Sequence, residues 1–196
     1  MDEFYSIVAP VQSEALVVKK SKFIAYAYPM KTEATLKKHL QALRKAHPKA
    51  VHCCSAWRLT EQAFGYSDDG EPANSAGAPI YGQLLSFDLY RVLVVVVRYY
   101  GGINLGVGGL ISAYKSAAAM ALASATVVKV FKQQRLELCF EYADTASVFR
   151  AIELFEITIL EREETASCVF IVEIKVKHLL AFKKMIDASP IKYRLL

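Results

Sequence analysis

The sequence predicts an α+β protein with two domains, which we expect at residues 1–130 and 131–196. Residues 91–100 are apolar at nearly every position, as in a central strand that is covered on both faces. A glycine-rich loop and an alanine-rich helix follow this strand directly, which places the loop at a strand-to-helix junction. From residue 135 onward the pattern reads strand, helix, strand, strand, helix, strand, the order of a ferredoxin-like domain.

The elements of the first domain follow from apolar periodicity and from chain-breaking residues. Leu36, Leu40 and Leu43 share one face of an amphipathic helix over residues 32–47, which ends at Pro48 and carries lysines and an arginine on its outer side. The other expected elements are strands at 14–18 and 22–28 joined by a turn at 19–21, a strand at 51–60, a loop at 61–72, a helix at 73–87, the strand at 91–100 and a helix at 110–124.

The second domain is expected after a linker at residues 127–134, and the charge balance changes near that point. Residues 1–132 contain 15 basic and 9 acidic residues, a formal charge of +6, whereas residues 133–196 contain 9 and 10, a charge of −1. A basic surplus in the first domain suits an acidic partner such as RNA, although surface lysines also serve solubility. The expected elements are strands at 135–142, 157–162, 168–176 and 191–196 and helices at 145–155 and 178–187.

Composition argues against several functional classes. The four cysteines form no Cys-x-x-Cys pair, so we expect no zinc site, no disulfide framework and no cofactor. The longest aliphatic run, at residues 92–97, is far shorter than the roughly 20 residues of a membrane helix, so we expect no membrane partner. The first residues are acidic where a secretory leader is basic. A cytoplasmic location is therefore expected.

The glycine-rich loop at residues 101–109 is the first candidate site. Backbone N–H groups in such a loop, with the free N–H groups at the start of the next helix, form a concave site for an anion. Arg98 could add a charge-assisted contact to a phosphate or carboxylate. Alternatively, the glycines serve tight strand–helix packing, and Arg98 pairs with a carboxylate of the loop before it. The glycines concerned are Gly101, Gly102, Gly106, Gly108 and Gly109.

The second candidate site is an acidic loop with three carboxylates within four residues, Asp68, Asp69 and Glu71. Such a group could bind Mg²⁺ or act in acid–base catalysis, and ordinary turn and helix-cap chemistry explains it nearly as well. His52 and Cys54 could share one side of a strand as base and thiol, but a core role suits them better. We therefore assign no catalytic residue and no metal ligand.

Two segments resemble the signature of the IMPACT/YigZ family. They are FGYSDDGEPA at residues 64–73, with AGAP at 76–79, and VVVRYYGG at residues 95–102, and KSKFI at 20–24 supports them. Ala78 and Ser112 stand where a lysine is common in the family. The resemblance implies a first domain similar to elongation factor G domain IV, a mixed sheet with a βαβ crossover. It also implies a ferredoxin-like second domain similar to elongation factor G domain V, and a role in regulating translation.

The leading functional hypothesis is a non-enzymatic module that binds RNA, the ribosome or a translation-associated protein through a basic surface around the glycine loop. Besides the residues of the two candidate loops and Arg98, that surface would include Lys22, Arg58 and Lys115. The alternatives are a protein–protein adaptor, or a small-molecule phosphotransferase of the galactokinase type, although the Gly-Lys-[Ser/Thr] of a P-loop is absent. The oligomeric state and the identity of the partner stay open at this point.

Overall fold

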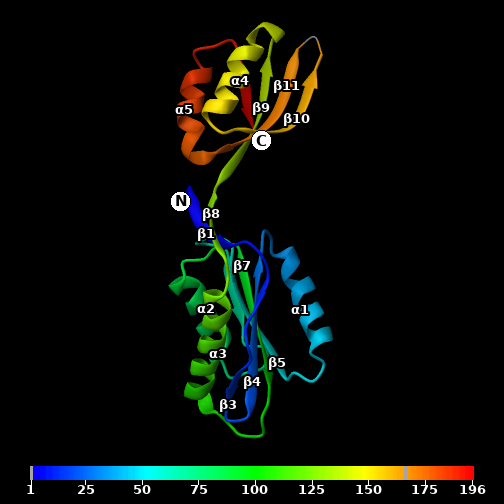
Figure 1. The fold of residues 1–196 in the computed structure, drawn as a ribbon, viewed down its shortest axis with the longest axis vertical. Coiled ribbons are helices and arrows are strands. Elements are labelled where there is room, and N and C mark those ends of the chain that lie inside the picture. The colour runs from blue at the N-terminus through cyan, green and yellow to red at the C-terminus, as the bar shows by residue number, and fades with distance from the viewer. Residues whose placement is uncertain (1, 166) are drawn as a thin grey trace. The chain divides into compact units, whose positions relative to one another are not determined.

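The computed structural model describes residues 2–165 and 167–196 and confirms the α+β class. The chain forms two compact units, each with its own core (Figure 1). The first unit comprises Tyr5–Lys129, and the second comprises Val130–Leu196 together with the few residues that precede Tyr5. A two-stranded ribbon, β1 (Glu3–Ile7) paired with β8 (Val127–Phe131), contains the positions at which the chain passes between the units.

The first unit is built on one antiparallel sheet in the order β2-β4-β7-β5-β6, with β3 also paired to β4. The sequence predicts a mixed sheet, and the antiparallel pairing corrects this. β4 and β5 are parallel to each other, but β7 lies between them and runs antiparallel to both, so the βαβ crossover through α1 is present in a split form. The strands are β2 (Val11–Gln12), β3 (Leu16–Val18), β4 (Ser21–Pro29), β5 (His52–Arg58), β6 (Phe64–Ser67) and β7 (Val92–Tyr99).

Helices cover both faces of this sheet, α1 (Ala34–Ala46) on one face and α2 (Gly77–Ser86) with α3 (Gly106–Ala123) on the other (Figure 1). Strand side chains alternate between the faces, so β7 contributes to the apolar cluster on each face of this sheet. Its even-numbered valines, such as Val94, pack with α2 and α3, and Val95 packs with α1. Both faces of β7 are thus buried, which explains its continuous apolar sequence.

Two helices begin four residues away from the predicted position. The helix expected from residue 73 begins at Gly77, because residues 68–76 form a turn that caps it. The helix expected from residue 110 begins at Gly106, so Gly106, Gly108 and Gly109 lie in its first turn and not in a loop. Glycine has low helix propensity, but the buried packing of Leu110 and Tyr114 further along outweighs it.

The second unit has the expected ferredoxin-like order and an antiparallel sheet arranged β10-β11-β9-β12. Its buried centre includes Leu136, Phe170 and Phe182, from two strands and a helix. The elements are β9 (Gln133–Phe140), a 3₁₀ turn (Tyr142–Asp144), α4 (Thr145–Leu154), β10 (Thr158–Glu164), β11 (Cys168–Lys175), α5 (Val176–Ile186) and β12 (Lys192–Leu195). Among the described residues, no helix is long and apolar enough to cross a membrane.

Candidate functional site

Two exposed lysines form the turn between β3 and β4. Val18 pairs with Ser21 in the antiparallel register, which leaves Lys19 and Lys20 as a two-residue hairpin loop. Both have positive φ, 44° and 67°, the backbone of a turn that Asn-Gly usually occupies. A non-glycine residue in this conformation costs on the order of 1 kcal/mol or more. The sequence therefore holds two cations at a position where other residues would be more stable.

The glycine loop packs directly against this turn. A Cβ at Gly101 would lie 2.0 Å from the carbonyl carbon of Lys20 and 2.3 Å from the backbone nitrogen of Ser21, so only glycine fits. The Gly101 N–H donates to Ser21 Oγ at 3.1 Å. The loop and the lysine turn are thus fixed to each other at one end of the sheet.

The amino end of α3 and Lys22 complete this end of the unit. Gly102 and Gly106 have φ of +79° and +71°, and no side chain caps the first turn of α3, whose N–H groups have no partner within the helix. Lys22 is exposed on β4, and Lys115 is exposed farther along α3. We call Lys19, Lys20, Lys22 and residues 101–109 the basic tip.

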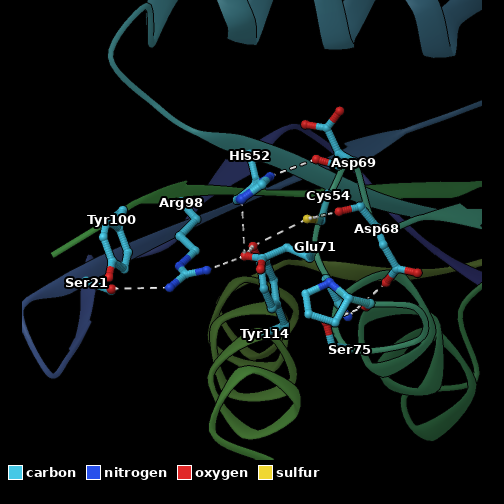
Figure 2. A network of polar contacts seen from close by, with 12 residues as sticks. Ser21, His52, Cys54, Asp68, Asp69, Glu71, Ser75, Arg98, Tyr100 and Tyr114 are labelled. Carbon is cyan, nitrogen blue, oxygen red and sulfur yellow. Dashed lines mark hydrogen bonds and ion pairs between the residues drawn. The ribbon is translucent and has the colours of Figure 1, made fainter. Parts of the chain in front are cut away.

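Arg98 does not belong to the exposed surface. Its side chain is 7% exposed, and Nη1 donates to Glu71 Oε1 at 2.5 Å, where the Glu71 side chain is 3% exposed. Arg98 Nη2 also donates to Ser21 Oγ at 3.5 Å (Figure 2). The structure therefore matches the alternative in which Arg98 pairs with a carboxylate of the acidic loop. The pair lies beneath the basic tip and ties β7 to the acidic loop.

Other polar side chains converge on Glu71 from β5 and α3 (Figure 2). Tyr114 of α3 donates its hydroxyl to Glu71 Oε1 at 2.7 Å, and His52 Nε2 of β5 lies 3.9 Å from the same oxygen. Cys54 Sγ donates to the Asp68 carbonyl at 3.0 Å and lies 3.3 Å from the Tyr114 hydroxyl. Burial raises the pKa of Cys54, and nearby carboxylates raise it further, so the residue stays a thiol and is unsuited to nucleophilic attack.

The two aspartates of the acidic loop hold backbone groups. Asp68 Oδ1 accepts from the N–H groups of Ala76 and Gly77 at 2.9 and 2.8 Å, and Oδ2 accepts from Asn74 at 2.9 Å. Burial alone would raise the pKa of Asp68, but these three hydrogen bonds lower it below the usual value. The carboxylate therefore caps the amino end of α2.

Asp69 fixes the loop to β5. Its Oδ2 accepts from the Cys53 N–H at 2.6 Å, its other oxygen pairs with Arg44 of α1, and its carbonyl accepts from His52 Nδ1 at 2.7 Å. Within residues 2–165 and 167–196, no cluster of His, Cys, Asp and Glu is arranged to hold a metal ion. The carboxylates of the acidic loop thus bind groups of the protein itself.

Arg58 lies at the opposite end of β5 from the basic tip. In the β5–β7 register Arg58 pairs with Val92, whereas His52 pairs with Arg98. The Arg58 guanidinium lies 3.6 Å above the ring centroid of Tyr90 and bonds the Tyr90 hydroxyl. Its Nη1 is 3.5 Å from Asp88 Oδ1. Arg58 therefore does not join the surface to which the sequence analysis assigned it.

The structure thus brings together Lys22 and the glycine loop, and buries Arg98, Glu71 and Arg58. Sequence reasoning overlooked Lys19 and Lys20 as site residues and treated them only as a turn. The available signal was the pair of adjacent lysines in a two-residue connection between two strand-like segments, a place where Asn, Gly or Asp is the usual choice.

Fold and site together define the class, a two-domain α+β protein with a split-βαβ first unit that carries a basic tip and a ferredoxin-like second unit. The model of the Impact N-terminal domain matches residues 19–122, more than half of the chain. The chain therefore belongs to the IMPACT family.

Curated relatives and solved structures are similar to this chain. IMPACT family member YigZ of Escherichia coli is 39% identical over 129 residues, which cover 64% of this chain and 63% of that protein. The match thus spans less than two thirds of that relative. A crystal structure described as a hypothetical protein is 30% identical, covers 100% of this chain and 98% of its own, and has a TM-score of 0.75. The structure of the two-domain translational regulator Yih1 is 25% identical, covers 60% of this chain and 47% of its own, and has a TM-score of 0.39.

Proposed function

We propose that the first unit binds the phosphate backbone of RNA through the basic tip, as a non-enzymatic component of translation in the cytoplasm. The observation that carries this proposal is the Lys19-Lys20 turn, where two lysines occupy strained positive-φ positions and extend into solvent. Strain of this kind persists when a function needs the residue. Here the only property that lysine adds over Asn-Gly is a long cationic side chain.

The charge distribution supports an anionic partner. Among the described residues no ion pair involves Lys19, Lys20, Lys22 or Lys115, so their charges are not neutralised within the protein. The neighbouring carboxylates of the acidic loop are held by Arg98, Arg44 and backbone N–H groups. A compact group of lysines next to free helix N–H groups attracts phosphates.

Family membership supplies the link to translation. The chain shares the IMPACT family with YigZ, and Yih1 is described as a translational regulator. Ribosomal RNA offers a dense row of phosphates, which suits the basic tip better than a protein surface of mixed charge. A protein partner in translation is the outcome that the test below would favour if RNA does not bind.

The phosphotransferase alternative gains no support from the site. Transfer of a phosphoryl group needs side chains that position Mg²⁺ and an attacking group. Asp68 and Asp69 bind backbone N–H groups of their own chain, and Glu71 is paired with Arg98. We therefore assign binding and not catalysis to this end of the unit.

The test is a fluorescence-anisotropy titration of the full chain with a labelled oligouridine about 12 nucleotides long. Three or four phosphate contacts predict a slope of log affinity against log salt of about −2 to −3 between about 50 and 200 mM salt. The variant Lys19→Glu/Lys20→Glu should bind at least about tenfold more weakly and have a shallower slope, because two contacts become repulsive. The matched control is Lys183→Glu/Lys184→Glu, an equal change of charge on α5.

The proposal fails in two cases. Wild-type protein that shows no salt-dependent RNA binding would leave a protein partner as the better explanation. Equal loss of affinity in the Lys19→Glu/Lys20→Glu variant and the α5 control would show that net charge, and not the basic tip, governs binding.

A further inference from the structure

A row of aromatic side chains begins next to the basic tip, on the face of β4 that points toward the α1 side of the sheet. Phe23, Ala25 and Ala27 of β4 are buried with α2 and α3. The alternate positions Lys22, Tyr26 and Tyr28 therefore lie on the opposite face, where both tyrosines are partly exposed. α1 packs on β5 and β7, so this part of β4 lies beside the helix.

Hydrogen bonds fix the orientation of three rings in this row. The Tyr26 hydroxyl lies 2.7 Å from His47 Nε2, and the Tyr99 hydroxyl lies 2.7 Å from His47 Nδ1. A neutral imidazole has one donor and one acceptor nitrogen, so one tyrosine donates to His47 and the other accepts. The rings of Tyr26 and Tyr99 are held in place while part of each side chain stays accessible.

A second pair of rings extends the row along β4. Tyr28 stacks on His39 of α1 with ring centroids 4.2 Å apart and an interplanar angle of 23°. Tyr28 is also nearly parallel to Tyr26, with centroids 6.4 Å apart and an interplanar angle of 9°. We call Tyr26, Tyr28, His39, His47 and Tyr99 the aromatic row.

Two lysines, Lys22 and Lys38, border the aromatic row. Burial lowers the pKa of His47, and the charge of Lys22 lowers it further. Burial and the charge of Lys38 likewise lower the pKa of His39. Both imidazoles are therefore neutral rings at neutral pH, beside fixed positive charges. From Lys22 to Tyr28 the strand spans about 20 Å, at ~3.3 Å per residue.

We propose that the bases of single-stranded RNA stack on the aromatic row while its backbone passes along Lys38 and reaches the basic tip at Lys22. The inference rests on the proposed function and narrows the partner to single-stranded RNA. Phosphate contacts alone would bind duplex and single-stranded RNA equally. Aromatic platforms beside lysines are suited to unpaired bases, which expose their faces. A duplex keeps its bases stacked inside, where the aromatic row cannot reach them.

The first test uses the wild-type chain, so that it does not depend on a variant that folds. An oligouridine carrying 5-iodouridine is bound, irradiated and mapped by mass spectrometry. Cross-links at Tyr26, Tyr28 or Tyr99 support the proposal. Cross-links confined to residues 19–22 and 101–109 overturn it and leave the proposed function intact.

The second test compares affinities. Tyr26→Leu and Tyr99→Leu should each weaken oligouridine binding by about fivefold or more, whereas Tyr26→Phe, which keeps the ring, should bind like wild type. The matched control is Tyr66→Leu, an exposed tyrosine on β6 that stacks on Tyr81. A duplex of equal length should bind more weakly than oligouridine and should not respond to Tyr26→Leu.

Two patterns of results separate this inference from the proposed function. Equal binding of single strand and duplex, with no effect of Tyr26→Leu but a loss in Lys19→Glu/Lys20→Glu, overturns the aromatic row alone. No RNA binding by the wild-type chain overturns both proposals.

Discussion

Cations occupy one end of the first unit in two different ways. Arg98 is buried, bonded to Glu71 at 2.5 Å and to Ser21, and it joins the acidic loop to β7. Lys19 and Lys20 are exposed and occupy strained backbone positions directly before Ser21. The residue type fits each role, because a guanidinium forms directed hydrogen bonds in a buried site and a lysine keeps its charge in water.

The comparison teaches that a basic residue in a family signature need not be a ligand contact. Arg98 is in one of the two segments that resemble the family signature, yet its neighbours are Glu71, Ser21 and the Phe23 ring at 5.5 Å. Lys19 and Lys20 lie in an ordinary-looking turn and face solvent. Loss of Arg98 should therefore reduce stability, and loss of the lysines should reduce binding.

The largest effect is expected from breaking the buried pair. Glu71→Ala leaves the Arg98 charge buried without its partner and should lower the free energy of unfolding by about 3–5 kcal/mol. Urea denaturation followed by circular dichroism measures the change, with Glu61→Ala, an exposed carboxylate in the connection between β5 and β6, as the control. A loss below about 1 kcal/mol would mean that the Arg98–Glu71 pair contributes little, as surface pairs do.

The next effect concerns the contact between the glycine loop and the lysine turn. Gly101→Ala places a methyl group against the Lys20 backbone and should cost about 1–3 kcal/mol. Gly108→Ala is the matched control, because its Cβ would meet no atom within 4 Å and alanine favours the helix. Thermal unfolding of both variants gives the comparison, and equal melting temperatures would contradict the close packing of loop and turn.

A smaller, pH-dependent effect is expected at the cap of α2. Asp68→Ala should cost about 1–2 kcal/mol at neutral pH. The folded-state pKa of Asp68 is lowered, so its contribution is present above the unfolded value of about 3.9 and is lost as pH falls through the lower, folded value. Urea titrations between about pH 7 and 3 should show wild type and variant converging in acid. A constant difference would contradict the role of the ionised carboxylate.

The sequence predicted the layout better than the site. Apolar periodicity located β7, α1 and the six elements of the second unit, because burial dictates those patterns directly. The split position of β7 between β4 and β5 depends on which strands pair over long range, and no local pattern encodes that. Side-chain burial at Arg98 and Arg58 depends on the same pairing. The sequence therefore could not decide whether Arg98 binds a ligand or pairs with a carboxylate, and it assigned Arg58 to the surface.

For the basic tip, the sequence could predict the turn but not the surface that the turn helps to form. The turn at Lys19 and Lys20 could be predicted from the strands on either side, but its positive φ angles could not be recognised from lysines, which seldom adopt them. The contact of residue 101 with this turn joins positions that are 80 residues apart in the chain. Only the folded sheet shows that the turn and the glycine loop form one surface.

The most direct test of the contrast between stabilising and binding cations is the variant Lys19→Asn/Lys20→Gly. Asn-Gly suits the two-residue turn, so the free energy of unfolding should rise by about 1 kcal/mol, while affinity for oligouridine should fall about tenfold with a shallower salt slope. Opposite signs for stability and binding, measured on one purified variant, are the predicted result. Unchanged RNA affinity in a more stable protein would contradict the account, because the lysines would then have no binding role.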